Sequence, residues 1–199
     1  MIIMVKDVYL FRHGQTDLNL SGVWQGSGVD AELNENGKRQ VEMLSDKVKW
    51  LGLEKLYSSP LLRAVQTANR IAQKSLTPMD IVIMQDLREV HFGDCDGQRD
   101  VVVEVRYGKE FVQNFLCPTK ETWNRAFANG ECKHRVFHRV LECLKRAVKE
   151  KENTIGIVCH AGVISSLACG FGLKDVSYEN CAILHLVYDT ETGLFSQEQ

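Results

Sequence analysis

Two histidines occupy similar positions in distant parts of the chain. Arg12-His13-Gly14 follows the apolar residues 8–11, and His160-Ala161-Gly162 follows the apolar residues 155–159. Each histidine is therefore expected at the end of a strand, with a nearby glycine that relaxes the turn. A neutral imidazole can act as a nucleophile or a base, and an arginine matches the geometry of a phosphate. A lone histidine after a strand is usually a hydrogen-bonded loop residue, but this pair favours a site for an anion.

Arg63 is a second candidate ligand for an anion. Ser59-Pro60 predicts the start of a helix, with serine as the N-cap and proline in the first helical position. Arg63 would then lie in the first turn, where a cation opposes the helix macrodipole. A solvated arginine is the ordinary interpretation, whereas an arginine that shares a bound anion with the helix terminus would be stabilised.

The elements that must position these residues follow from the hydrophobic pattern. Strands are predicted at 8–12, 55–58, 81–84, 154–159 and 182–188, and helices at 34–51, from 59 onward, at 131–151 and at 163–173. This alternation predicts the α/β class, as a three-layer α/β/α sandwich with a largely parallel central sheet. Ligands bind such sheets at the carboxyl ends of the strands. Residues 98–130 show no clear period and are expected to form short helices and loops over the site.

Composition and charge limit the class of protein. The 199 residues are 44% hydrophobic and 25% charged, which is typical of one globular domain spanning 1–199. Lys and Arg number 24 against 26 Asp and Glu, so no nucleic-acid or membrane partner is expected. The uncharged residues 153–173 are long enough to cross a membrane. Their polar side chains and four glycines favour a strand, a turn and a helix instead.

Cysteine usage indicates where the protein resides. Seven cysteines are scattered singly, with no C-x-x-C pair, which predicts reduced thiols in a cytoplasmic protein and argues against structural zinc. The apolar residues 1–5 are too short for a signal-peptide core. His134 and His138 are four residues apart, but they lack the glutamate and the third ligand of a zinc motif, so no metal site is predicted.

Two further groups of residues are interpreted as structural. The basic residues of the helix at 131–151, Lys133 among them, alternate with glutamates and predict a mixed solvated surface. Aromatic residues near the predicted loops could line an entrance to the site, but packing at the core or rim is the preferred interpretation for Trp24, Phe92, Tyr107, Phe111 and Trp123.

Four segments, in order along nearly the whole chain, resemble one known family. Residues 10–16 read LFRHGQT, residues 58–68 read SSPLLRAVQTA, residues 87–97 contain LRE and GDCDG, and residues 157–164 read IVCHAGVI. Together they resemble the histidine phosphatase superfamily, in its phosphoglycerate mutase-like branch. R-H-G alone would be a weak signal, whereas four segments on the expected elements are specific.

The resemblance implies a role for each matching residue. His13 would be the nucleophile that forms a phosphohistidine, and Glu89 would donate a proton to the leaving oxygen. The phosphoryl oxygens would be held by Arg12, Arg63, His160 and Asn19, by the loop at Gln25-Gly26, and by the helix start at Ala161-Gly162. The family uses neither a metal nor an organic cofactor for this reaction. Gln15, Cys95-Asp96 and Ala161 depart from residues frequent in the family, and each could reshape the pocket.

The chemistry independently asks for these side-chain types. Phosphoryl transfer depends on positioning and charge neutralisation, and two arginines supply two positive charges against a monoester dianion. The nucleophilic histidine must be neutral, and the nearby guanidinium groups of Arg12 and Arg63 disfavour the imidazolium form of His13. Its other ring nitrogen must be hydrogen-bonded to fix the tautomer. Glu89 must carry a proton when the leaving oxygen departs.

These observations predict a phosphomonoesterase that acts on a small phosphorylated metabolite through a phosphohistidine. A mutase shares the apparatus, but mutases resembling this sequence carry a longer insertion that excludes water. Here Glu89 and His160 are only 71 positions apart. A non-catalytic binder of phosphorylated ligands is the other alternative, against which the presence of His13, Glu89 and His160 argues. Sugar phosphates, phosphoglycerates, α-ribazole phosphate and phosphoproteins all remain open as substrates, and the sequence does not predict the oligomeric state.

Overall fold

One mixed sheet forms the centre of the molecule. The computed structural model describes residues 5–198. The six strands lie in the order β3-β2-β4-β1-β5-β6. Their bounds are β1 Val5–Arg12, β2 Lys55–Ser58, β3 Ile81–Ile83, β4 Thr154–Cys159, β5 Ile183–Asp189 and β6 Phe195–Gln197. The first four strands are mutually parallel, and β5 and β6 run antiparallel at one edge. The predicted α/β fold with a largely parallel sheet is confirmed.

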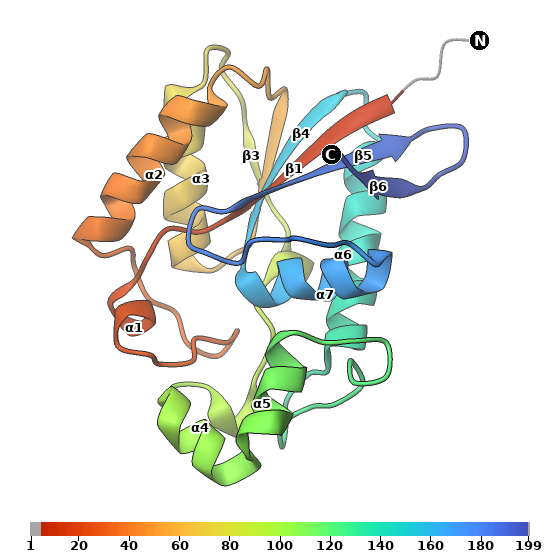
Figure 1. Ribbon diagram of the computed structural model, residues 1–199. Helices are drawn as coiled ribbons and strands as arrows, with labels where there is room; N and C mark the ends of the chain where they lie inside the picture. Colours follow the sequence, from red (N-terminus) through yellow and green to blue (C-terminus); the bar gives the residue numbers. More distant parts are fainter. Residues whose placement is uncertain (1–4, 199) are drawn as a thin grey trace.

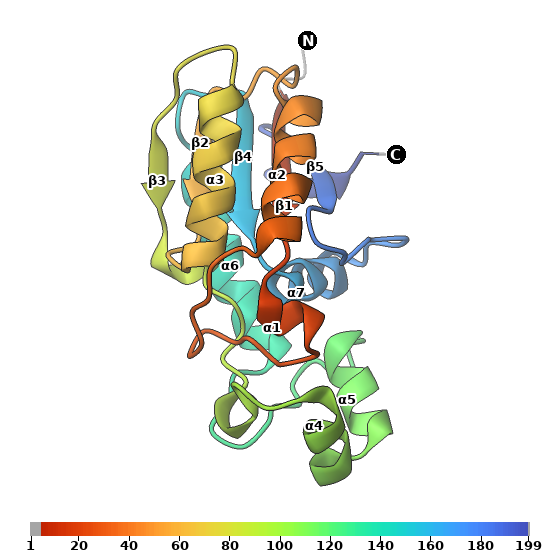
Figure 2. The ribbon, with the colours of Figure 1, turned by 90° about the vertical axis from the view of Figure 1, so that its left-hand side faces the viewer.

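Helices cover both faces of this sheet (Figure 1). On one face lie α2, Glu35–Val48, and α3, Leu62–Lys74; on the other lie α6, Lys133–Val148, and α7, Ala161–Phe171. Figure 2 shows α2 and α3 side by side in front of the strands. Side chains alternate along the strands as this layering requires: Phe11 and Val158 pack with α2 and α3, whereas Leu10 and Ile157 pack with α6 and α7.

The observed boundaries correct two predictions. Helix α3 begins at Leu62 rather than at Ser59, because Leu61 is extended (φ −69°, ψ 137°) and serves as the N-cap. The side chain of Ser59 instead contacts His160. Helix α7 begins at Ala161, directly after β4, so that His160 itself is its N-cap. Strand β6 was not predicted, since three residues carry too little periodicity to be recognised.

Residues 98–130 form a helical extension beyond the carboxyl ends of the parallel strands. Helices α4, Asp100–Tyr107, and α5, Lys109–Leu116, lie together below α1, Asp17–Leu20, and α7 in both views (Figure 1, Figure 2). Gly108 joins them with a φ of 85°, a conformation that favours glycine. The extension packs through Phe127, whose ring lies 4.5 Å from Phe115 and 5.3 Å from Trp24.

The stretch that raised the question of a membrane span folds as β4 followed by α7. Within residues 5–198, no helix has the length and apolar character needed to cross a membrane.

Candidate active site

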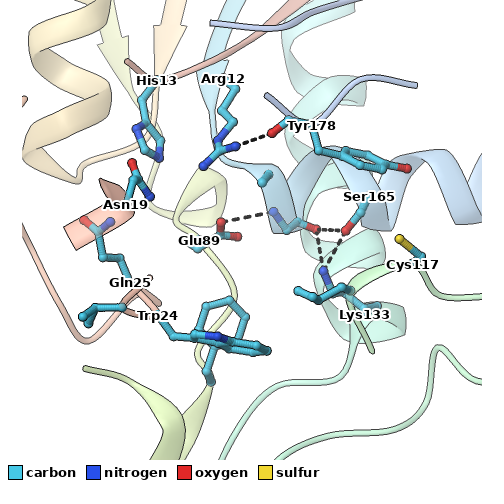
Figure 3. A pocket seen from close by; sticks show the side chains of 15 residues that line it. Arg12, His13, Asn19, Trp24, Gln25, Glu89, Cys117, Lys133, Ser165 and Tyr178 are labelled. Carbon is cyan, nitrogen blue, oxygen red and sulfur yellow. Dashed lines mark hydrogen bonds between the residues drawn. The ribbon is translucent and has the colours of Figure 1, made fainter. Parts of the chain in front are cut away.

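A pocket of about 360 Å³ opens at the carboxyl ends of β1 and β4 (Figure 3). This is the position expected for a ligand site in such a sheet. Its wall includes seven of the predicted site residues: Arg12, His13, Asn19, Gln25, Glu89, Ala161 and Gly162. The other three, Gly26, Arg63 and His160, are not part of this wall, and Arg63 and His160 are fully buried. The wall thus brings together predicted residues from three of the four segments, and the segment 58–68 contributes none.

His13 is held in the tautomer and charge state that a nucleophile needs. Its ring is 3% exposed, and Nδ1 lies 2.7 Å from the carbonyl oxygen of Gly14. Because a carbonyl can only accept, Nδ1 carries the proton and Nε2 keeps a lone pair. Burial, together with the charges of Arg63 and Arg12, lowers the pKa of His13 well below its usual range. A side chain at Gly14 would collide with Val41 and the backbone of α2, so this turn requires glycine.

His160 lies beside His13, with a ring-to-ring distance of 5.1 Å, but its own contacts differ. Its Nε2 lies 2.7 Å from Oγ of Ser59, and its Nδ1 has no partner within residues 5–198. Burial and the charge of Arg63 also lower its pKa well below the usual range. His160 is therefore a neutral, fully buried imidazole beside His13.

The two predicted arginines, Arg12 and Arg63, differ in their position and in their hydrogen bonds. Arg12 lines the pocket, and its Nη1 donates to the carbonyl oxygen of Tyr178. Arg63 is fully buried, and its two Nη atoms donate to the carbonyl oxygens of Val29 and Gln25, each at 3.0 Å. Arg63 thus ties the loop at 25–29 to helix α3. Burial lowers the pKa of both guanidinium groups, although both remain charged near neutral pH.

Unpaired buried polar atoms cluster in the site. Among the described residues, five buried side-chain nitrogen or oxygen atoms have no hydrogen-bond partner, and four of them belong to predicted site residues: Arg12 Nε, Gln25 Nε2, Arg63 Nε and His160 Nδ1. A buried donor without a partner costs about 1–3 kcal/mol. All four nitrogens are able to donate, so an anion that reached them would offset this cost.

The loop that follows β1 orients Asn19 and Gln25. Thr16 caps helix α1 and exchanges hydrogen bonds with Asn19, while its hydroxyl donates to Oε1 of Gln25 at 2.9 Å. Asn180, a residue that sequence reasoning missed, donates to the carbonyl oxygen of His13 at 3.1 Å and lies 3.4 Å from Oδ1 of Asn19. Since the amide oxygens are engaged, the amide nitrogens of Asn19 and Gln25 are the groups left for a ligand. A side chain at Gly26 would collide with Asp96, so this position requires glycine.

Glu89 is held at the start of helix α7. Its Oε2 accepts the backbone N–H of Gly162 at 3.1 Å, and its Oε1 accepts the N–H of Val90 at 2.8 Å. The side chain is 6% exposed and reaches the pocket wall (Figure 3). A Cβ at Gly162 would collide with the carboxylate. The N-terminus of α7, expected to bind an external anion, therefore holds the protein's own carboxylate at this N–H group.

The prediction that Lys133 lies on a solvated surface is wrong. Its side chain is 1% exposed and lines the pocket, where Nζ donates to Oγ of Ser165 at 2.7 Å. Burial lowers the pKa of Lys133 to about 8, and Glu89 opposes that shift. Helical spacing could have revealed this position, because Lys133 falls three, four and seven residues before the core residues Val136, Phe137 and Val140.

The histidine pair and the aromatic residues noted in the sequence contact neighbouring side chains in the structure. His138 and His134 contact each other through their Nε2 atoms at 3.0 Å, and the described residues contain no group of three side chains suited to hold a metal. Trp24 and Phe92 pack edge to face at 4.8 Å, and both also line the pocket.

Comparison with known proteins decides the family. A sequence model described as histidine phosphatase superfamily (branch 1) matches residues 8–197. The chain belongs to this family. The resemblance inferred from the four segments is thereby confirmed.

Two relatives and one solved structure match most of the chain. The chain is 32% identical over 166 residues to phosphoglycerate mutase-like protein 4 of Arabidopsis thaliana, covering 81% of this chain and 69% of the relative. It is 28% identical over 195 residues to phosphoserine phosphatase 1 of Hydrogenobacter thermophilus, covering 92% and 87%. Among solved structures, phosphoglycerate mutase from Bacillus anthracis superposes with a TM-score of 0.86 at 23% identity, covering 99% and 93% of the two chains, which establishes the shared fold.

Proposed function

We propose that this protein is a phosphomonoesterase that forms a phosphohistidine at Nε2 of His13. The observation that carries the proposal is the state of this imidazole: it is neutral, and its Nδ1 proton is committed to the Gly14 carbonyl. Nε2 therefore has a lone pair available, on a side chain that lines the pocket. Membership of the histidine phosphatase superfamily supports the same assignment.

The proposed first step transfers the phosphoryl group to the protein. Nε2 of His13 forms a bond to phosphorus while the ester P–O bond breaks. The leaving oxygen takes its proton from the Glu89 carboxyl group, which lies in the wall of the same pocket. Arg12, Asn19 and Gln25 bind the phosphoryl oxygens through their nitrogens, and Ala161 and Gly162 shape the wall beside them.

The second step returns the protein to its starting state. Water attacks phosphorus, the P–N bond breaks, and the electron pair returns to Nε2 of His13. The Glu89 carboxylate accepts the proton of this water, so inorganic phosphate leaves and Glu89 is ready to act again as an acid. His160 and Arg63 support the reaction without lining the pocket, His160 beside the nucleophile and Arg63 by its charge and by holding the loop at 25–29.

A phosphatase is favoured over a mutase by the short chain between Glu89 and His160. That segment forms α4, α5 and α6, and the 360 Å³ pocket at its base opens to solvent. Water is therefore expected to compete for the phosphoenzyme. The relative named phosphoserine phosphatase 1, matched over 92% of this chain, supports the same choice.

Four further proposals accompany this function. We propose that residues 1–199 form one domain, because the sheet joins strands from both ends of the chain. The seven free cysteines support a cytoplasmic location. The substrate is proposed to be a small phosphomonoester, and the reaction is proposed to need no metal and no organic cofactor.

The test is turnover of p-nitrophenyl phosphate with and without excess chelator, combined with trapping of the phosphoenzyme by acid-free quenching. We expect chelator-resistant release of p-nitrophenol and a protein-bound phosphate that is acid-labile and alkali-stable. His13→Ala should abolish both, whereas His138→Ala, a control on the exposed face of α6, should change neither. Turnover that persists in His13→Ala would refute the proposal, as would chelator-sensitive activity restored by a divalent ion.

A further inference from the structure

Lys133 is a buried positive charge that the proposed reaction does not use. It lies across the pocket from His13 (Figure 3), and Phe115, whose ring lies 5.1 Å from Nζ, packs against it. The lysine ammonium has three N–H groups. One donates to Ser165 at 2.7 Å, and the carbonyl oxygen of Gly162 lies at 3.5 Å.

The protein neutralises this charge only in part. Within residues 5–198, the polar groups in hydrogen-bond contact with Nζ are a hydroxyl and a carbonyl, both uncharged. Glu89 acts on Lys133 electrostatically, but no hydrogen bond joins the two side chains within residues 5–198. Burial of a charge without an opposite charge is strongly unfavourable. A buried lysine of this kind requires a compensating function, and the pocket that it lines is the place to look for one.

The phosphoryl group of a substrate does not need Lys133. The two negative charges of the phosphoryl group are balanced by the positive charges of Arg12 and Arg63. The Nε atoms of both arginines have no hydrogen-bond partner within residues 5–198. A pocket of about 360 Å³ also lies within the range for whole small-molecule ligands, so it can hold the body of a substrate beyond its phosphate. The wall that includes Lys133 also contains the apolar or weakly polar side chains of Trp24, Phe92 and Leu116. The lysine is therefore the charged group that can select what the far end of a substrate carries.

We propose that Lys133 binds a second anionic group of the substrate, a carboxylate or a second phosphate, and so selects phosphomonoesters that are charged at both ends. This inference rests on the proposed function for its kinetic consequences. Ser165 orients the ammonium through its Oγ, while its own hydroxyl donates to the Gly162 carbonyl at 3.2 Å. The backbone N–H of Gly162 in turn donates to Glu89. Gly162 therefore connects the second-anion site, through its carbonyl oxygen, to the proposed acid, through its N–H group.

The test compares substrates that differ in one charged group. In the carboxylate arm, 3-phosphoglycerate is compared with glycerol 3-phosphate; in the phosphate arm, propane-1,3-diyl bisphosphate is compared with 3-hydroxypropyl phosphate. The measured quantity is the ratio of kcat/KM within each pair. We expect the wild-type ratio to favour the doubly anionic member of at least one pair, and Lys133→Met to lower that ratio at least tenfold. Lys145→Met, an exposed lysine of the same helix, should leave it within twofold.

Each outcome separates the two proposals. If Lys133→Met lowers the kcat/KM ratio in one arm, that arm identifies the anion that Lys133 binds. If the ratios of Lys133→Met stay within twofold of the wild-type ratios in both arms, the inference is overturned. A uniform loss with every substrate, accompanied by a lower melting temperature, would mark Lys133 as structural and overturn it too. Calorimetry measures the affinity of the same four compounds for His13→Ala, with and without Lys133→Met, and so tests the second-anion site in the absence of turnover. Discrimination in binding without turnover in the wild type would refute the phosphatase and keep the site.

Discussion

The two ends of the pocket are built in different ways. At the phosphate end, Arg12 and His13 emerge from β1, and His160 emerges from β4, so neighbouring parallel strands place them together. At the far end, Lys133 comes from α6, Leu116 from α5 and Trp24 from the loop after α1. The sheet dictates the first arrangement, whereas helix packing dictates the second. The residues proposed to carry out the reaction thus lie in short sequence motifs, whereas the residues proposed to select the substrate are brought together only by tertiary structure.

Glu89→Gln should give the largest effect and defines what the phosphate end does. With alkyl phosphates kcat should fall on the order of 10²–10⁴-fold, because the leaving alkoxide no longer receives a proton. With p-nitrophenyl phosphate the first step needs little such help, so a burst of p-nitrophenol should precede a slow steady state. The burst amplitude in stopped-flow measurements and the trapped phosphoenzyme check this.

The matched control is Glu142→Gln, which changes an exposed carboxylate of α6 that pairs with Lys145 at 2.9 Å outside the pocket. It should show no burst and no difference between aryl and alkyl substrates. Equal losses with both substrate types in Glu89→Gln would mean that Glu89 is not the acid, and Asp94 or Asp96 would be examined next.

Arg12→Lys and Arg63→Lys should both lose activity, but only one should lose stability. Arg12 donates to Tyr178 through Nη1 and keeps Nε for a ligand, and a lysine cannot do both. A lost charge-assisted hydrogen bond of about 1.5–3 kcal/mol corresponds to roughly a 10–150-fold fall in kcat/KM. Arg63→Lys should in addition lower the melting temperature, since it breaks the bonds to Val29 and Gln25.

Steady-state kinetics and thermal unfolding of the two variants separate these effects, with Arg70→Lys as a control for a partly exposed arginine of α3 paired with Glu42. A fall of less than threefold in Arg12→Lys would show that Arg12 does not bind the phosphoryl group. An unchanged melting temperature in Arg63→Lys would contradict the role assigned to its carbonyl bonds.

The difference between the two ends also explains what the sequence could predict. Residues 8–11 of the strand that ends at Arg12 are apolar or aromatic, and the strand that ends at Cys159 is almost wholly buried; both strands were predicted together with the histidines that follow. The helices of residues 98–130 could not be located from the sequence. Helix α4 is rich in valine but buries Val103 and exposes Val101 and Val105, so its hydrophobic pattern has no clear period. Lys133 was missed because residue type was given more weight than its place on the apolar face of α6.

Lys133→Met should stabilise the protein, which distinguishes the far end from the phosphate end. The pKa of Lys133 falls from 10.5 in the unfolded chain to about 8 in the folded protein, which corresponds to a cost of about 3 kcal/mol below pH 8. This cost disappears as the pH rises from 8 towards 10.5, because the unfolded chain then also loses its proton. Glu89, Cys117 and Cys169 are the titratable groups that act on Lys133 over this range.

Urea unfolding at pH 7 and at pH 9.5 measures this cost of burying the charged form of Lys133. The stabilisation produced by Lys133→Met should be of the order of 2–3 kcal/mol at pH 7 and clearly smaller at pH 9.5. Lys145→Met should be neutral at both values. A destabilised Lys133→Met would indicate that the hydrogen bond to Ser165 outweighs the cost of burying the charge.

The phosphate end should show its own dependence on pH, at acid values and with the smallest effect. His13 and His160 have folded-state pKa values well below 6.5, mainly because they are buried. Below about pH 6.5 the unfolded chain binds protons that the folded protein does not, so the free energy of unfolding decreases as the pH falls. Both histidines should contribute to this decrease between pH 7 and pH 5.5. Urea unfolding of His13→Gln/His160→Gln should show a flatter dependence than the wild type, whereas His138→Gln should retain the full slope. An unchanged slope in the double variant would mean that the folded protein accepts these protons, and His13 could not then remain the neutral nucleophile at acid pH.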